Sequence, residues 1–284
     1  MFVRIVSGAV AAAILVVILM LPSYFLGITV LAAALIGLYE YARAVRMKNI
    51  KVDLVVSYTA AFVLIANAFV TTLPVKEGSP LTDFIEGLFT NVTIGAVVFL
   101  IVVFLFFRIL FENGKYKMDD VAYTLFGIVY IPYLLSFAAM IRNMDRGFEY
   151  IWLVIIGASV TDMFAYFAGV LFGKNKIIPA ISPKKTVEGS IGGAIGCMLV
   201  MLAYGGVFIN RIGMPQVPVY HFILIGLLCG IISQIGDWAA SAVKRSTGVK
   251  DFGRLIPGHG GIMDRCDSFL FVAPAVYFYI SMFF

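Results

Sequence analysis

Charged residues and cysteines are both scarce in this chain of 284 residues. Only 13% of the residues are charged, about half the share found in soluble domains, which excludes a soluble globular protein. The three cysteines, Cys197, Cys229 and Cys266, lie far apart and form no C-x-x-C pair, so neither a disulfide framework nor a zinc cluster is indicated. Rossmann and P-loop motifs are absent as well.

The chain is instead rich in long hydrophobic segments. Hydrophobic residues make up 62% of it, and the mean hydropathy is +1.00. A membrane-spanning helix needs about 20 apolar residues, and runs of this kind recur along the whole sequence without the alternation of an outer-membrane barrel. The sequence therefore predicts an all-α polytopic membrane protein with the lipid bilayer as its solvent. Its nine transmembrane helices are expected at residues 4–21, 24–43, 53–73, 91–111, 119–141, 149–172, 187–209, 219–244 and 264–283.

The cations are unequally distributed between the two sides that these helices define. One side holds Arg4, Arg43, Arg46, Lys48, Lys51, Arg108, Lys115, Lys117, Lys174, Lys176, Lys184, Lys185, Lys244, Arg245, Lys250, Arg254 and Arg265. The other side holds Lys76, Arg142, Arg146 and Arg211. The positive-inside rule makes the first side cytoplasmic. We therefore expect an integral protein of the inner (cytoplasmic) membrane with a cytoplasmic active site, and no nucleic-acid partner despite the net charge of +5.

The first apolar segment resembles a signal peptide because Arg4 precedes it. The segment ends in Leu21-Pro22-Ser23-Tyr24, without a small-x-small cleavage site. We expect it to be retained as a transmembrane helix.

Ionisable residues inside the apolar segments divide the chain. We expect N-terminal transmembrane helices over 1–75, middle helices over 76–145 and a C-terminal catalytic region over 146–284. Before residue 146, Glu40 is the one carboxylate inside an apolar run. The last region contains Asp162, Glu188, Asp237, Asp264 and Asp267 within or at the ends of its segments. Charged groups at membrane depth are costly, which makes them functional candidates.

A polar stripe runs along segment 219–244 and consists of Ser233, Asp237, Ser241 and Lys244. At about 100° per residue these positions cover only about 80° of a helix surface. Such a stripe must face a partner or water. Interhelical hydrogen bonds with a snorkelling lysine would explain it, and so would a substrate site.

The segment at 244–268 combines five cations with flexible backbone. Gly258, Gly260 and Gly261 leave exposed backbone amides, which together with the cations can cradle phosphates.

Asp264 and Asp267 are three residues apart at the start of the last helix, so both can reach one cation. Helix capping would also explain this pair, with Asp264 as the N-cap. Capping does not involve Asp237. Three carboxylates beside cations at the cytoplasmic face favour Mg²⁺ and a polyphosphate substrate, because Mg²⁺ commonly binds one or two carboxylates plus substrate phosphates.

A companion segment precedes the seventh predicted helix. Lys184 and Lys185 lie beside the start of this helix, where an anion is attracted, and Thr186 can cap it. Two small-x-x-x-small pairs follow and favour close helix packing: Gly189/Gly193 and Gly192/Gly196.

These segments resemble the signature of a known family. The residues that carry the resemblance are Ser241, Lys244, Arg245, Lys250, Asp251, Gly253, Pro257, His259, Gly260, Gly261, Asp264, Arg265 and Asp267. Two shorter segments add to it, namely residues 182–186 with Glu188 and Gly189, and Asp162 with Ala165 and Tyr166. Over about residues 125–284 the chain resembles phosphatidate cytidylyltransferases, also called CDP-diacylglycerol synthases. Cys266 departs from the aliphatic or aromatic residue that is usual there.

The resemblance implies transfer of CMP from CTP to phosphatidic acid, which yields CDP-diacylglycerol and pyrophosphate for phospholipid biosynthesis. It also implies Mg²⁺, with a second cation left open. Because the phosphate of phosphatidate is already anionic near neutral pH, its attack on the α-phosphorus of CTP needs alignment and charge neutralisation more than a strong base. A homodimer is favoured by the family and by the small-residue motifs.

Residue roles follow from this interpretation. The expected catalytic residues are Asp237, Lys244, Asp264 and Asp267, of which the three aspartates also bind the metal. The expected substrate-binding residues are Lys184, Lys185, Ser241, Arg245, Lys250, His259, Gly260 and Gly261. The sequence does not decide whether the two adjacent lysines bind the lipid or CTP. For His259, a hydrogen bond to phosphate or a contact that fixes the loop is favoured over a general base, and His221 is expected to be interfacial.

Two other classes of protein share some of these features. A cation-coupled transporter also carries carboxylates on membrane helices, but it usually centres them at mid-bilayer and often shows inverted repeats, which this sequence lacks. A CTP-dependent lipid kinase would need similar groups and would transfer the γ-phosphoryl group instead.

Overall fold

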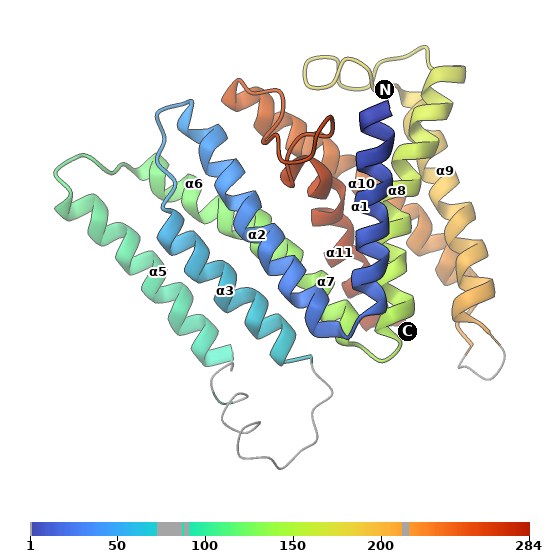
Figure 1. The fold of residues 1–284 in the computed structure, drawn as a ribbon, viewed down its shortest axis with the longest axis horizontal. Helices are drawn as coiled ribbons and strands as arrows, with labels where there is room; N and C mark the ends of the chain where they lie inside the picture. Colours follow the sequence, from blue (N-terminus) through green and yellow to red (C-terminus); the bar gives the residue numbers. More distant parts are fainter. Residues whose placement is uncertain (1, 73–86, 88–90, 212–215) are drawn as a thin grey trace. The chain divides into compact units, whose positions relative to one another are not determined.

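The structure, a computed structural model, describes residues 2–72, 87, 91–211 and 216–284, and every named element in this part is a helix (Figure 1). The α-helices are α1 (Phe2–Met20), α2 (Ser23–Arg46), α3 (Leu54–Val70), α5 (Asn91–Phe111), α6 (Met118–Ile128), α7 (Leu134–Asn143), α8 (Gly147–Phe172), α9 (Val187–Tyr204), α10 (Val219–Thr247) and α11 (Met263–Phe283). The π-helical turn η1 (Val129–Tyr133) joins α6 to α7, and η2 (Gly205–Ile209) extends α9.

The predicted all-α membrane architecture is confirmed. Six helical stretches of the described residues are long and apolar enough to cross a membrane: Ser23–Arg46, Met118–Asn143, Gly147–Phe172, Val187–Ile209, Val219–Thr247 and Met263–Phe283. Three shorter apolar helices accompany them: Val6–Met20, Leu54–Val70 and Gly95–Phe111. Each of the nine predicted segments therefore corresponds to a helical segment of the described chain.

Local sequence signals set the ends of several helices. Asp53 accepts a hydrogen bond from Val56 N at 3.0 Å and caps α3. Thr186 caps α9 as predicted, through Gly189 N at 3.1 Å. Pro132 lies inside η1, where its missing N–H and bulky ring favour a π-helical turn within an otherwise continuous helix.

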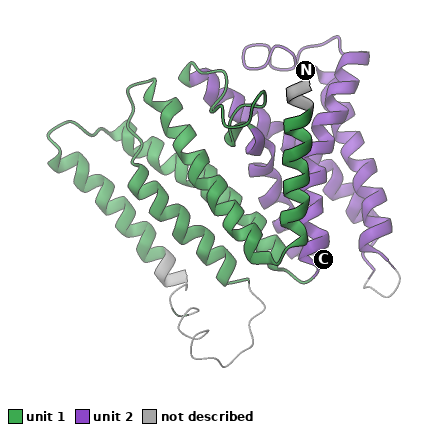
Figure 2. Ribbon diagram, in the orientation of Figure 1, with its two compact units in different colours: residues 1–145, 247–264 green, residues 146–246, 265–284 purple. Residues whose placement is uncertain are grey.

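The chain forms two compact units (Figure 2). Unit 1 comprises Met1–Asp145 and Thr247–Asp264, and unit 2 comprises Arg146–Ser246 and Arg265–Phe284. The loop that follows α10 thus belongs with the N-terminal helices, although it lies within the expected catalytic region of the sequence. The expected boundary at 75/76 lies outside the described residues.

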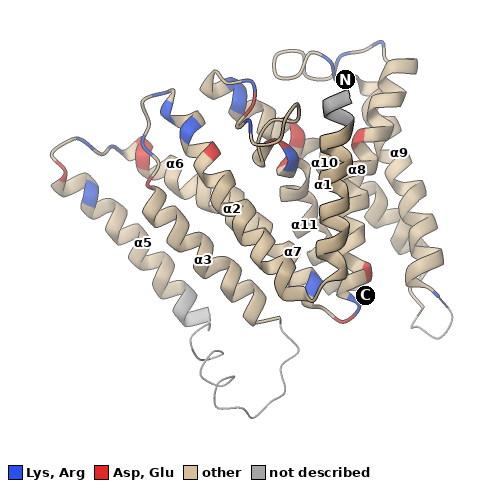
Figure 3. Ribbon diagram, viewed as in Figure 1, with Lys and Arg blue, Asp and Glu red and all other residues tan. Residues whose placement is uncertain are grey.

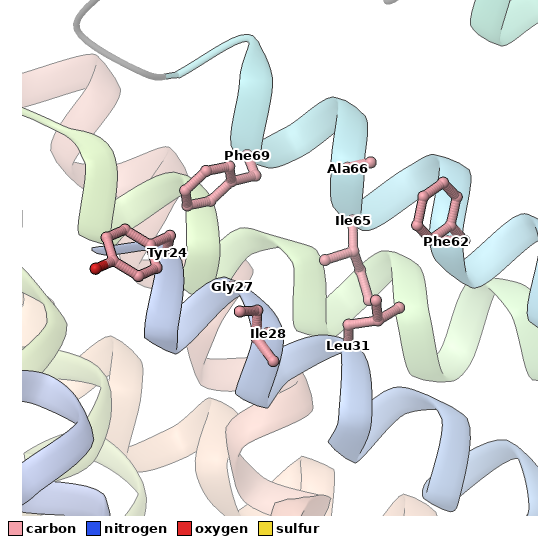
Figure 4. A pocket seen from close by; sticks show the side chains of 8 residues that line it. All are labelled: Tyr24, Gly27, Ile28, Leu31, Phe62, Ile65, Ala66 and Phe69. Atoms are coloured by element: carbon pink, nitrogen blue, oxygen red, sulfur yellow. The ribbon is translucent and has the colours of Figure 1, made fainter. Parts of the chain in front are cut away.

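Unit 1 has an apolar interior between its helices. Tyr41 of α2 is buried against α6, where a Cβ atom at Gly127 would lie 2.8 Å from its ring, and its hydroxyl donates to Tyr123 O at 3.1 Å. A groove of about 160 Å³ between α2 and α3 is lined by apolar and aromatic side chains, including Tyr24 and Phe69 (Figure 4). A carboxylate on Asp53 pairs with Arg108 and fixes α5 against α3.

Unit 2 is built around close contact between α8 and α9. A Cβ atom at Gly192 would lie 2.3 Å from Ala168 Cβ, one at Gly193 would lie 2.9 Å from Ala165 Cβ, and one at Gly196 would meet an aromatic ring at 2.2 Å. The predicted role of these glycines in close helix packing is confirmed. Because the packing is within one chain, the glycines give no support to a second copy.

Candidate active site

An ion pair between Lys185 and Asp237 lies among the polar groups of unit 2. Lys185 Nζ is 2.9 Å from Asp237 Oδ2, and both side chains are partly buried. Asp162 and Asp267 also attract the charge of Lys185 electrostatically. Helices α8, α10 and α11 therefore each contribute one carboxylate near this amine. Burial lowers the pKa of Lys185, but these carboxylates outweigh it and raise the pKa above its ordinary value. The amine therefore carries a charge at neutral pH.

Close packing of α10 against α11 brings two of these carboxylates together. A Cβ atom at Gly236 would lie 2.7 Å from the carbonyl oxygen of Asp267, so glycine is needed at this crossing. One turn away, Ser268 Oγ donates to Ser233 O at 3.2 Å. Asp237, directly after Gly236, is thereby placed beside Asp267.

The polar stripe of α10 faces this region over part of its length. Asp237 and Lys244 both interact electrostatically with the carboxylate of Asp267. Arg245 donates from Nε to Ile181 O at 3.3 Å and ties the end of α10 to the loop that carries the paired lysines. The predicted residues that the structure brings together in unit 2 are Lys185, Asp237, Lys244 and Asp267.

Besides Asp237 Oδ2, which pairs with Lys185, two buried polar atoms of α10 have no hydrogen-bond partner among the described residues. They are Ser233 Oγ and Trp238 Nε1. Buried polar atoms are normally paired, so this helix offers unused hydrogen-bonding capacity near the ion pair. Ser241, two turns beyond Ser233, is half-buried.

A cavity of about 250 Å³ lies beside the ion pair in unit 2. Asp162 and Lys185 line it, as do Tyr166, Lys184 and Thr186. The two lysines supply positive charge, and Thr186 marks the N-terminus of α9, whose backbone N–H groups favour an anion. The cavity is therefore suited to a phosphate group.

Glu188 holds the loop that carries these lysines. Its carboxylate accepts hydrogen bonds from Lys174 N at 3.1 Å and from Asn175 N and Nδ2 at 3.2 and 2.8 Å. Val187 N donates to Asn175 O at 2.9 Å and closes the loop base. Glu188, a functional candidate by its place in the sequence, thus anchors the loop from the first turn of α9.

Asp264 is bound within unit 1. Its Oδ2 atom accepts hydrogen bonds from Phe252 N at 2.8 Å, Gly253 N at 3.4 Å and Gly261 N at 3.0 Å. The side chain is buried, with 6% of its surface exposed. Asp264 therefore folds the loop before α11 around its own carboxylate, a role akin to the capping alternative.

Of the three carboxylates expected to share a metal, two belong to unit 2 and one belongs to unit 1. Asp237 and Asp267 are neighbours in unit 2, while Asp264 organises the loop of unit 1. Within the described residues no set of three or more His, Cys, Asp and Glu side chains has a metal-binding arrangement.

His259 makes a contact that fixes the loop, one of the two roles favoured for it. Its Nδ1 is 2.9 Å from Ser7 Oγ, which also donates to Pro257 O at 3.0 Å. Gly260 has a φ of +83°, a backbone conformation that glycine adopts without strain. The loop is held in this shape by a bridge in which Ile256 N donates to Gly260 O at 2.9 Å.

A second basic pocket, of about 500 Å³, lies in unit 1. Arg43, Lys250 and Arg254 line it together with Asp251. Arg43 also donates from Nη2 to Phe252 O at 2.7 Å. Three cations against one carboxylate leave the pocket positive, so the predicted phosphate-binding residue Lys250 is part of an electropositive surface.

Sequence reasoning assigned no role in the site to Ser7, Glu40 or Arg43. All three bind the loop Thr247–Asp264 from helices of the N-terminal half. Glu40 gave a signal, because it is a carboxylate inside an apolar run. Ser7 and Arg43 gave none beyond the topological count of cations.

Each unit collects most of its basic residues at one end of its helices (Figure 3). In unit 1, Lys51 Nζ donates to Lys115 O at 3.1 Å and joins two basic loops. In unit 2, Arg211 pairs with Glu149 at 2.9 Å at the other end of the helices. Lys76 lies outside the described residues. The clustering agrees with the cation asymmetry on which the predicted orientation depends.

Together, the membrane helices and the charged pockets define a class, that of polytopic membrane enzymes acting on anionic substrates. The model of the cytidylyltransferase family matches residues 2–283. The chain belongs to this family. The match includes the N-terminal helices, which the sequence signature did not reach.

Several curated relatives match this chain over nearly its full length and nearly theirs. The phosphatidate cytidylyltransferase of Bacillus subtilis is 31% identical over 281 residues, covering 99% of this chain and 97% of the relative. That of Staphylococcus haemolyticus is 32% identical over 92% of this chain and 94% of the relative. That of Synechocystis is 30% identical over 98% and 96%, respectively. The predicted family is confirmed.

Proposed function

We propose that this chain transfers CMP from CTP to phosphatidic acid and forms CDP-diacylglycerol and pyrophosphate in phospholipid biosynthesis. The observation that carries the proposal is the family match across residues 2–283, with relatives named phosphatidate cytidylyltransferase over almost their full length. The cavity beside Lys185 and Asp237 supports it, because both substrates bring phosphate groups.

The chemistry places simple demands on the side chains. An oxygen of the lipid phosphate forms a bond to the α-phosphorus of CTP, and the bond from that phosphorus to the bridging oxygen breaks as pyrophosphate leaves. No proton has to be removed from the anionic phosphate near neutral pH. The protein must align two anions and neutralise their charge, which positioned cations achieve. Lys184, Lys185, Lys244, Arg245 and Lys250 are suited to this task.

A metal would fit the carboxylates of unit 2. Asp237 and Asp267 are like charges in close proximity, and Lys185 balances them only in part. We assign Mg²⁺ to this pair, with a second cation left open, since Mg²⁺ commonly takes one or two carboxylates plus substrate phosphates. Asp264 stays a proposed site residue within its own loop of unit 1. When bound, the metal would neutralise charge on the nucleotide phosphates.

The protein is a multi-pass membrane protein, and its bacterial relatives favour the inner membrane. We further propose a cytoplasmic active site, supported by the basic end of each unit. A cysteine placed at Leu255, which is 58% exposed, should react in intact cells with membrane-permeant reagents alone. Labelling by an impermeant reagent would reverse the orientation. The proposal of a homodimer now depends on the family alone.

The deciding experiment uses labelled CTP on the purified protein with phosphatidic acid, with and without Mg²⁺. Label from the α-position should enter the lipid, and pyrophosphate should appear in equal amount. Entry of γ-label would instead indicate a lipid kinase. Ion uptake into liposomes without CTP would indicate a transporter.

A further inference from the structure

Glu40 is a buried carboxylate on α2 that binds a loop more than 200 residues away. Its Oε2 accepts a hydrogen bond from Met263 N at 2.9 Å, and its Oε1 accepts one from Ile262 N at 3.2 Å. Only 4% of the residue is exposed. A buried charge is stable only when hydrogen-bonded, so these two backbone donors are its main compensation.

The loop is shaped to admit this carboxylate. A Cβ atom at Gly253 would lie 1.9 Å from Glu40 Oε1, and one at Gly261 would lie 2.2 Å from the same atom. Neither position tolerates a side chain while Glu40 is in place. Arg43, one turn further along α2, adds a third hydrogen bond, to Phe252 O at 2.7 Å.

Glu40 and Asp264 hold the same stretch of backbone from two sides. Asp264 accepts from the N–H groups of Gly253 and Gly261, the two glycines that make room for Glu40. Loss of Glu40 would therefore free the backbone that fixes Asp264. The basic pocket would change as well, since Lys250 lies three residues before Gly253.

We infer that Glu40 is a positioning residue for the reaction, which holds the loop Thr247–Asp264 so that Lys250 and Asp264 keep their places toward substrate. This inference rests on the proposed function of that loop. Glu40 itself acts through its backbone contacts with Ile262 and Met263.

Asp120 provides a matched control. It is buried to the same degree, with 3% exposed, and it also accepts two backbone hydrogen bonds, from Lys51 N at 2.5 Å and Lys117 N at 2.7 Å. Neither donor belongs to the loop Thr247–Asp264. If the role of Glu40 were only structural, its variants should behave like Asp120→Asn.

The experiment compares Glu40→Gln and Glu40→Ala with Asp120→Asn in detergent. Hydrogen–deuterium exchange of peptides covering residues 252–263 should accelerate in both Glu40 variants and stay unchanged in Asp120→Asn. The kcat/KM for CTP should fall roughly 10- to 100-fold in Glu40→Ala, a range typical of lost support for a ligand. It should fall less in Glu40→Gln, which keeps one acceptor oxygen, and Asp120→Asn should lower thermal stability with little kinetic change.

Two results would overturn the inference. One is unchanged exchange in folded Glu40→Gln and Glu40→Ala, and the other is faster exchange with unchanged kinetics. If Glu40→Ala does not fold, Glu40→Gln carries the test. An unaltered protein that transfers no α-label to lipid would refute the proposed function, and exchange would still decide whether Glu40 holds the loop.

Discussion

Units 1 and 2 each hold a cation-bearing loop with a glutamate, but the two glutamates differ in origin. Glu188 belongs to the helix that directly follows its loop, and it binds Lys174 and Asn175, 14 and 13 residues away. Glu40 belongs to α2 and binds Ile262 and Met263, 222 and 223 residues away. The first anchor is a property of one segment, whereas the second ties an N-terminal helix to the loop Thr247–Asp264. The difference explains why the N-terminal helices and the loop Thr247–Asp264 form one compact unit.

The largest effect is expected from the carboxylates of unit 2. Asp237→Asn and Asp267→Asn should each lower transfer of α-label by about 100-fold or more, because each removes a charge that interacts with Lys185 and that the proposed metal requires. Product formation over a range of Mg²⁺ concentrations measures the loss. The exposed Asp119→Asn serves as the control and should keep the parental rate. If the folded variants Asp237→Asn and Asp267→Asn keep the parental turnover and the parental Mg²⁺ dependence, neither aspartate belongs to the active site.

The loop lysine of unit 2 should matter next. Lys185→Met keeps length and removes charge, and we expect a rise of roughly 10- to 100-fold in KM for one of the two substrates, which would also show which substrate the cavity binds. Lys176→Met, in the same loop, is the control. If KM for both substrates is the same in Lys185→Met as in the parent, the ion pair is a structural contact only.

The protonation state of Lys185 gives a pH prediction. Its pKa is raised in the folded protein, so the ion pair contributes stability below the unfolded pKa of about 10.4, and that contribution is lost as pH rises through the still higher folded pKa. Between pH 7 and about pH 10, KM should show no step that depends on Lys185. A step near pH 8 in the parent that is absent from Lys185→Met would contradict this.

Loss of the local anchor in unit 2 should have a smaller effect than loss of the distant anchor in unit 1. Glu188→Gln retains one acceptor oxygen, and the hydrogen bond from Val187 N to Asn175 O still closes the loop base. We expect a loss of about two- to fivefold in kcat/KM, smaller than that of Glu40→Ala, on the scale of one hydrogen bond. A Glu188→Gln effect as large as that of Glu40→Ala would erase the distinction between the two anchors.

The smallest effect is expected at Ser7. Ser7→Ala removes the hydrogen bond to Pro257 O and the contact with His259, and should cost about 1 kcal/mol of loop stability, seen as faster hydrogen exchange around residue 259. Thr59→Ala, on a helix surface of the same unit, is the control because Thr59 bonds only its own helix. No change at residue 259 would exclude α1 from holding the loop.

The helices and part of the site could be predicted because their signals are local. Apolar run lengths located each helix, and Thr186 marked the start of α9 through a side chain that reaches three residues ahead. Asp237 and Asp267 were selected because charge at membrane depth is costly, and Lys185 because it lies beside the start of a helix, where an anion is attracted. The glycines of α8–α9 packing were found by their four-residue spacing.

The rest could not be predicted, because it depends on contacts between distant segments. Nothing in the sequence near Asp264 indicates that Phe252 and Gly253 will fold back onto its carboxylate. The assignment of the loop Thr247–Asp264 to the N-terminal helices was equally hidden, and so the role of Glu40 was missed. Its place inside an apolar run was noticed, but no sequence spacing indicates a partner 223 residues later.

The distance between Glu40 and its partners also has a consequence for biosynthesis. At about 5–20 residues per second, a ribosome needs roughly 10–45 s to proceed from residue 40 to residue 263. Throughout that interval α2 has to be accommodated in the bilayer without the two backbone donors that compensate its carboxylate. The nascent helix must therefore keep this end close to water or carry a proton on Glu40 until the loop is made. A chain whose translation stops before residue 262 would lack both backbone N–H groups that donate to the buried carboxylate of Glu40.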